Sequence, residues 1–215
     1  MLEEPVQTFK DIKRAFGVTV NDVVLATVAA GLHRFLRSRG EATRGRVLRA
    51  MVPVSVRTGQ ESSAFGNRVS SVFVDLPIGR MGARRRLAEI AARTRHLKDS
   101  NQAVGAEFLI NIGAWAPPTI HAMAARLASR SRVINLVVSN VPGPQSAMYL
   151  AGARLLAQYP VMPLARNMGL SIATTSLAGT MAFGITADWD TVPDVDALAS
   201  SMVQSLGELR KAAGV

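Results

Sequence analysis

The sequence predicts an α/β fold in which helices pack against a mixed β-sheet. Short runs rich in β-branched residues alternate along the chain with longer segments whose apolar residues recur at helical spacing. Hydrophobic residues make up 48% of the 215 residues and charged residues 19%, a composition that can build a core. Neither an internal repeat nor a long linker interrupts the pattern, so residues 1–215 are expected to form a single domain.

The N-terminal part of the chain is predicted to be helical. Apolar residues share one side of residues 8–16, which predicts a short helix ending at Gly17. Thr19 then has the position of an N-cap, and Asp22 stands three residues later, as in a capping box. A second, long helix is therefore expected over 20–39.

The middle of the chain begins with two strands and continues with three helices. Enrichment in β-branched residues predicts strands over 47–56 and 67–76. Pro53 predicts that the first of these is an edge strand or carries a bulge, because proline cannot donate to a sheet ladder. The helices are expected over 82–99, 103–115 and 119–129.

The C-terminal part is predicted to supply the remaining strands and a closing helix. The short apolar run over 133–139 has the character of a buried strand. The other expected elements are a strand over 152–159, a hairpin of 168–176 and 180–188 across Leu177-Ala178-Gly179, and a helix over 194–213.

Composition excludes several kinds of chemistry. The chain has no cysteine, which excludes a disulfide framework, a cysteine-based zinc site and a cysteine nucleophile. Its three histidines, His33, His96 and His121, are too far apart for a local metal motif, and none has a triad-like partner nearby. We therefore expect no metal and no histidine base within this chain.

The net charge of +10 comes mainly from arginine and from the first half of the chain. Arginine, whose guanidinium group suits phosphate, provides 21 of the 25 basic residues. Residues 1–100 hold 18 of the 25 basic residues. On the helix over 82–99, Arg84, Arg85, Arg86 and Arg93 are first interpreted as a face exposed to solvent. The alternative is that they contact anionic lipid or the phosphates of a ligand. Aromatic residues are only 5% and no reading motif occurs, so nucleic-acid binding is not expected.

Segments for targeting or for spanning a membrane are not expected. The N-terminus is acidic, and the longest nearly apolar run covers residues 23–32, whereas a spanning helix needs about 20 residues. The sequence predicts a cytoplasmic protein, at most peripheral at the inner face of the plasma membrane or on lipid bodies.

Two groups of polar residues stand where ligand contacts often occur. Asn21 and Asp22 begin the long helix, where they satisfy free N–H groups and where a developing negative charge is also favoured. Ser139 and Asn140 end an apolar strand, and a hydroxyl or amide there can donate to an oxyanion. The proline and glycine that follow, Pro142-Gly143, predict a turn in which the glycine takes a positive φ.

Several ordered motifs resemble the C-terminal half of the bacterial wax ester synthase/diacylglycerol acyltransferase family. The resemblance runs from about Val18 to the end of the chain. The motifs are V-N-D-V-V-L-A (20–26), M-V-P-V-S-V-R (51–57), G-N-R-V-S (66–70), N-L-V-V-S-N-V-P-G-P (135–144), Y-P-V-M-P-L (159–164) and F-G-I-T-A-D-W-D-T-V-P-D (183–194).

The resemblance implies one lobe of a chloramphenicol-acetyltransferase-like, CoA-dependent acyltransferase fold. Such enzymes have two related lobes with a tunnel between them, which acyl-CoA enters from one side and an alcohol from the other. A histidine in the motif H-H-x-x-x-D-G takes the proton from the alcohol, which attacks the thioester. The implied product is triacylglycerol or wax ester, with acyl-CoA as co-substrate and no bound cofactor.

Two departures from the family pattern qualify what this chain can do. The motif H-H-x-x-x-D-G does not occur, so a histidine-bearing N-terminal lobe, from the same precursor or a partner chain, is implied, and the isolated chain is expected to be inactive. Leu177 stands where the family usually has a tyrosine.

The resemblance also gives roles to the two polar groups. Asn21 and Asp22 match the family's Asn-Asp motif, which lies close to the active site or supports it. Ser139, in V-S-x-x-P, resembles the position that supplies an oxyanion-stabilising hydroxyl in related acyltransferases. Asn140 is a weaker candidate for the same role, and Pro142 and Gly143 support the site.

Alternatives to an active lobe remain open. A catalytically inactive module that binds lipid or acyl-CoA would keep the fold, and Leu177 in place of tyrosine is consistent with it. Binding to an anionic membrane surface is compatible with either function, because diacylglycerol and long-chain alcohols reside in membranes.

Overall fold

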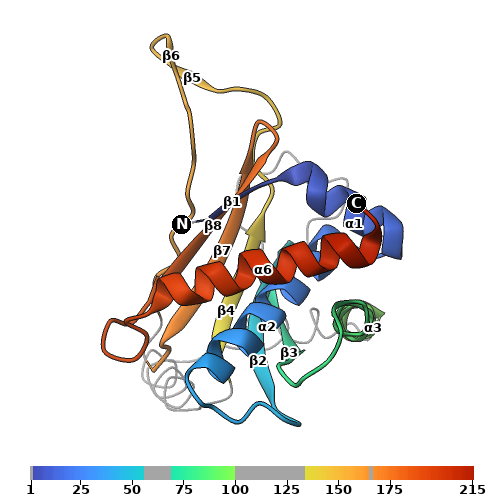
Figure 1. Cartoon of the computed structure of the whole chain (residues 1–215). Helices are drawn as coiled ribbons and strands as arrows, with labels where there is room; N and C mark the ends of the chain where they lie inside the picture. The colour runs from blue at the N-terminus through green and yellow to red at the C-terminus, as the bar shows by residue number, and fades with distance from the viewer. Residues whose placement is uncertain (1, 56–68, 100–133, 165–166) are drawn as a thin grey trace, which may run out of the picture.

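A computed structural model describes residues 2–55, 69–99, 134–164 and 167–215 and shows a sheet with helices on one face (Figure 1). Six strands pair in the order β1-β8-β7-β4-β2-β3. They are β1 (Leu2–Pro5), β2 (Val47–Ser55), β3 (Val69–Pro77), β4 (Leu136–Val141), β7 (Leu170–Leu177) and β8 (Thr180–Ala187). The helices predicted over 103–115 and 119–129 lie outside the described residues.

The sheet is mixed, as expected. Strand β4 runs parallel to both β2 and β7, and the other neighbours are antiparallel. The expectation for Pro53 is wrong: β2 is an interior strand, and its register with β3 is continuous, without a bulge. Pairing of β2 with β4 ends at Met51, so Pro53 lies past the last ladder position on that side.

Strands β2 and β4 separate after a short contact. They pair only at Ala50–Leu136 and Met51–Val137, whereas β4 continues along β7 as far as Val141. Among the described residues, the last residues of β4 therefore have a strand neighbour on one side only, which leaves backbone groups at this end of β4 outside the described ladder.

Four helices within the described residues cover the sheet: α1 (Val6–Phe16), α2 (Val20–Ser38), α3 (Ala83–Asp99) and α6 (Val195–Ala213). Helix α2 is almost wholly buried from Asp22 to Leu32, and its capping box between Thr19 and Asp22 is formed as the sequence predicts. It crosses α6 closely at Gly31, where a Cβ would lie 2.5 Å from Met202 Cγ. The apolar sides of the helices and the facing strand residues form one core.

Two segments differ from the sequence-based prediction. Strand β1 was not expected, and it pairs with β8 at the sheet edge. The strand expected over 152–159 is wrong: β5 (Tyr149–Leu150) and β6 (Ala153–Arg154) make a small hairpin on an arm that projects from the sheet (Figure 1). Exposed apolar residues on this arm gave it a strand-like pattern, but its two short strands pair only with each other and not with the six-stranded sheet.

No single helix in the described part of the chain is long and apolar enough to cross a membrane. By length and composition alone, α1 and α2 together pass the same test, but they meet at a bend of 101°.

Candidate active site

Ser139 lies near the end of β4 with its side chain buried. The residue is 4% exposed and stands opposite Ala173 of β7 in the parallel ladder. Its carbonyl oxygen accepts a bond from Thr174 Oγ1 at 3.4 Å, but no hydrogen bond of its hydroxyl is found among the described residues. A hydroxyl that has no partner among the described residues is free to donate to a ligand atom.

Asn140 faces the other side of the sheet. Successive strand residues alternate between faces, and Asn140 shares the helix-covered face with Val138, a core residue. Its Oδ1 accepts a hydrogen bond from Thr174 Oγ1 at 2.9 Å. Ser139 and Asn140 therefore cannot both serve one ligand atom on one face, and the geometry favours Ser139.

At Gly143, the segment after β4 packs closely against the end of β7. A Cβ at Gly143 would lie 1.9 Å from the carbonyl oxygen of Ser176, and the Gly143 N–H donates to Ser176 Oγ at 3.1 Å. One step further on, the Ala178 N–H donates to Pro144 O at 3.0 Å. The positive φ expected for Gly143 is wrong, because this glycine is required by close contact between backbones instead.

Leu177 is the last residue of β7 and directly follows Ser176. It is 6% exposed and pairs with Thr180, so the β7–β8 turn consists of Ala178 and Gly179, both with positive φ. This two-residue turn is the type that suits a tight hairpin. By strand alternation Leu177 shares the face of Ala173, the ladder partner of Ser139, so Leu177 lies on the Ser139 side of the sheet.

Asp22 joins the start of α2 to α3. Its Oδ2 accepts from the backbone N–H and the hydroxyl of Thr19, each at 2.8 Å, and its Oδ1 accepts from Thr94 Oγ1 at 2.6 Å. Both carboxylate oxygens thus accept hydrogen bonds within the protein, and Asp22 links the start of α2 to α3. Sequence reasoning missed Thr94, which shows no signal beyond its place on the apolar stripe of α3.

Asn21 is half-buried at the start of α2, and no side-chain bond is found for it among the described residues. None of the hydrogen bonds or ion pairs in the described part of the chain links Asn21 or Asp22 to Ser139 or Asn140. The structure places these two groups on different elements, with no hydrogen bond or ion pair between them in the part of the chain that it describes.

The four arginines singled out on α3 differ in their exposure: Arg84 and Arg85 face solvent, whereas Arg86 and Arg93 do so much less. Arg84 and Arg85 are exposed, and Arg84 lies over the Phe16 ring at 5.8 Å. Arg86 is 3% exposed and donates to Pro77 O and Gly79 O at 3.2 and 2.7 Å. Burial lowers the Arg86 pKa, and this guanidinium is committed to the protein's own carbonyls.

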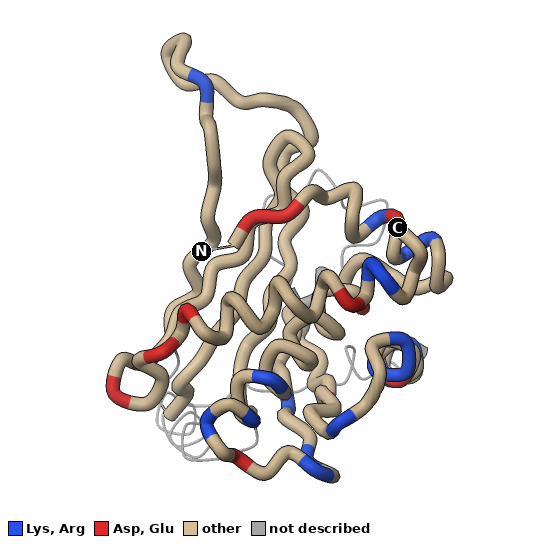
Figure 2. Tube along the Cα trace, in the orientation of Figure 1, with Lys and Arg blue, Asp and Glu red and all other residues tan. Residues whose placement is uncertain are grey.

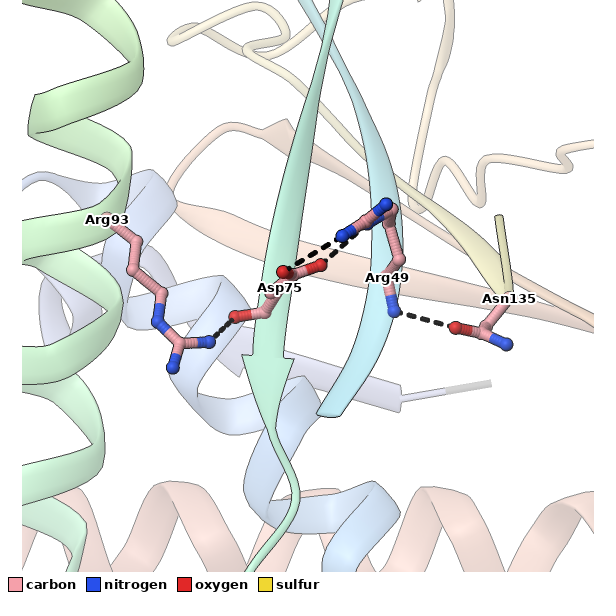
Figure 3. Close-up of polar contacts among 4 residues, drawn as sticks. All are labelled: Arg49, Asp75, Arg93 and Asn135. Carbon is pink, nitrogen blue, oxygen red and sulfur yellow. Dashed lines mark hydrogen bonds and ion pairs between the residues drawn. The ribbon is translucent and has the colours of Figure 1, made fainter. Parts of the chain in front are cut away.

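Arg93 belongs to a network that holds α3 against the sheet (Figure 3). It donates to the carbonyl oxygen of Asp75, whose carboxylate accepts two bonds from the Arg49 guanidinium at 2.7 and 3.1 Å. The bonds from Arg49 lower the Asp75 pKa. The Arg49 N–H in turn donates to Asn135 Oδ1 at 2.7 Å, which ties β2 to the start of β4.

The described residues offer neither a metal cluster nor a poised histidine base. No group of three His, Cys, Asp or Glu side chains that could hold a metal is found in the described ranges. His33 Nδ1 lies 2.7 Å from the carbonyl oxygen of Ile78. Burial lowers the His33 pKa, and the charges of Arg86, Arg37 and Arg34 lower it further, whereas the bond to Ile78 raises it. His96 is exposed on α3, and His121 lies outside the described residues.

Comparison with known proteins identifies the family. The model of the WS/DGAT C-terminal domain matches residues 65–210. The chain belongs to the wax ester synthase/diacylglycerol acyltransferase family. It is 34% identical over 207 residues to a probable diacylglycerol O-acyltransferase of Mycobacterium tuberculosis (strain ATCC 25618 / H37Rv), covering 95% of this chain and 45% of that protein. A putative diacylglycerol O-acyltransferase of Mycobacterium bovis matches to the same extent.

Solved structures agree with this WS/DGAT assignment. The wax ester synthase/diacylglycerol acyltransferase of Marinobacter aquaeolei VT8 matches with a TM-score of 0.78 at 28% identity, over 100% of this chain and 48% of that one. The starter condensation domain of rhizomide synthetase matches with a TM-score of 0.57 at 16% identity, over 98% of this chain and 45% of that one, which shows the shared fold alone. The chain thus spans less than half the length of these relatives.

Proposed function

We propose that this chain is the C-terminal lobe of an acyl-CoA-dependent O-acyltransferase that esterifies diacylglycerol or a long-chain alcohol. The reaction joins the alcohol oxygen to the thioester carbonyl carbon and releases the CoA thiol. A histidine of a separate N-terminal lobe takes the alcohol proton and returns it to the leaving sulfur. This chain completes the substrate tunnel and donates a hydrogen bond to the oxyanion.

The position of the Ser139 hydroxyl carries the proposal. The β4–β7 ladder fixes its backbone, and the Gly143–Ser176 contact immediately after β4 holds the end of that ladder in place. A donor that is held before the reaction stabilises a developing charge without reorganising. Because Ser139 has no hydrogen-bond partner of its own among the described residues, its hydroxyl can turn toward a substrate oxygen.

The projecting arm supports the need for a second lobe. Several of its apolar side chains are strongly exposed: Leu156 86%, Leu150 84% and Tyr149 64%. Exposed apolar side chains grouped on one projecting segment are typical of an interaction site. The family relatives are more than twice as long as the aligned region, which leaves an N-terminal portion to cover such a surface.

Replacing Ser139 with alanine tests the oxyanion role. In the presence of the histidine-bearing lobe, S139A is expected to lower kcat by roughly 100-fold or more with little change in KM, as for loss of one oxyanion donor. The matched control is S205A, which removes a buried hydroxyl that bonds only to Ser201 O within α6. If S139A and S205A retain the same kcat, Ser139 is not the donor.

Leu177 favours a second candidate, an inactive module that binds acyl-CoA or lipid. It places a buried aliphatic side chain where the family usually has a hydroxyl-bearing one, on the Ser139 side of the sheet. Saturable acyl-CoA binding without turnover, with the histidine lobe bound, would select this function over the first.

A further inference from the structure

A large open cavity lies away from the Ser139 end of the sheet. It has a volume of about 1290 Å³ and is bordered by the last turns of α2, the loop over 42–46, the start of β2 and the loop over 79–82 before α3. Val47, at its edge, begins β2, whereas Ser139 lies near the end of the parallel strand β4. From the register, the two are separated by about 20 Å along the strands.

Arginine dominates the lining of this cavity. Arg37, Arg44, Arg46 and Arg80 come from three separate segments and are all exposed. No ion pair or side-chain hydrogen bond is found for any of the four among the described residues. Lys and Arg also dominate this part of the fold in the charge view, around the end of α2, the loop after it and α3 (Figure 2).

The two acidic residues in the lining do not neutralise these charges. Glu208 pairs with Arg34, and Glu89 pairs with Arg93, so each acid already faces an arginine of its own. The first turn of α3 at the cavity edge contains no acidic residue either. Four unpaired guanidinium groups that converge on one concavity repel one another, and a bound anion relieves that repulsion.

We propose that this cavity is a binding site for phosphate groups, separate from the site of acyl transfer. Guanidinium groups match phosphate oxygens in pairs of parallel hydrogen bonds, and several of them from different segments can hold more than one phosphate. The volume admits a ligand larger than a single ion. Two sources carry this chemistry, a small soluble compound with clustered phosphates and the head group of an anionic phospholipid.

Calorimetric titration of the 215-residue chain with inorganic pyrophosphate tests the site. The informative variant is R44Q/R80Q, which removes two unpaired cavity charges. The matched control is R95Q/R154Q, which removes two exposed arginines that do not line the cavity. Circular dichroism and a thermal melt establish that both variants keep the fold of the original chain.

Saturable binding that weakens about tenfold or more in R44Q/R80Q, and less than twofold in R95Q/R154Q, supports the site. Equal weakening in the two variants would show attraction to the net charge only and would overturn the proposal. Co-sedimentation with vesicles of phosphatidylglycerol or phosphatidylcholine then separates the two sources. Cavity-dependent binding to the anionic vesicles assigns the head group, whereas pyrophosphate binding without vesicle binding assigns the soluble ligand; binding to neither probe overturns the site.

Discussion

The Cβ that Gly143 lacks would lie 1.9 Å from the carbonyl oxygen of Ser176. No side-chain rotation can relieve this contact, because the obstructing atom belongs to the backbone of β7. The contact joins the segment after β4 to the end of β7, four residues from Ser139. The segment over 135–144 therefore contains a glycine that packing requires as well as Ser139, the proposed oxyanion donor.

Gly143→Ala is expected to lower the free energy of unfolding by about 1–3 kcal/mol or more, since β4 and β7 must move apart. Urea denaturation measures the loss. Gly207→Ala is the matched control: it lies within α6 with no atom within 4 Å of the added Cβ, so it should stabilise by about 0.5–1 kcal/mol. Equal effects of the two substitutions would show that the contact at Gly143 does not constrain the fold.

Asp22 and Thr94 are expected to be energetically coupled. Asp22→Ala removes the Asp22 side of the capping box at the start of α2 and the bond to α3, with an expected loss of about 1–3 kcal/mol. A double-mutant cycle with Thr94→Val should give a coupling of about 0.5 kcal/mol or more. The cycle with Thr27→Val should be additive, because the Thr27 hydroxyl bonds only to Val23 O in its own helix; coupling in both cycles would contradict a specific link to α3.

His33 is expected to titrate below the ordinary histidine pKa of about 6.5. Its folded-state pKa lies below the unfolded value, so the neutral imidazole favours the fold. That contribution is complete above the unfolded pKa and is lost as pH falls through the folded pKa. NMR titration measures the shift, and Arg37→Gln should move the pKa upward by removing a nearby charge. A pKa above 6.5, or one unmoved by that substitution, would contradict this account.

Much of the fold follows from local signals in the sequence. Thr19 and Asp22 define the start of α2, and the residues that follow carry a helical period, so both the cap and the helix are confirmed. The hairpin of β7 and β8 is confirmed in the same way, because its turn glycine separates two strand-like runs.

The remainder depends on contacts between distant segments. Residues 2–5 form β1 only because β8 offers an edge, and four residues with two glutamates give no strand pattern of their own. The apolar residues over 152–159 suggested a strand, but only Ala153–Arg154 pair there, with β5 and not with the main sheet. At the site, Thr174 and Ser176 were missed because their roles come from pairing with β4, which a single strand's pattern does not reveal.

The account rests on this chain being one part of a two-lobe acyltransferase. Reconstitution tests that directly: ester formation from acyl-CoA and diacylglycerol is measured for the chain alone, for a histidine-bearing N-terminal lobe alone, and for both together. The account predicts ester only when both are present, with loss of that activity in S139A. Turnover by this chain alone, or an undiminished rate with S139A, would contradict it.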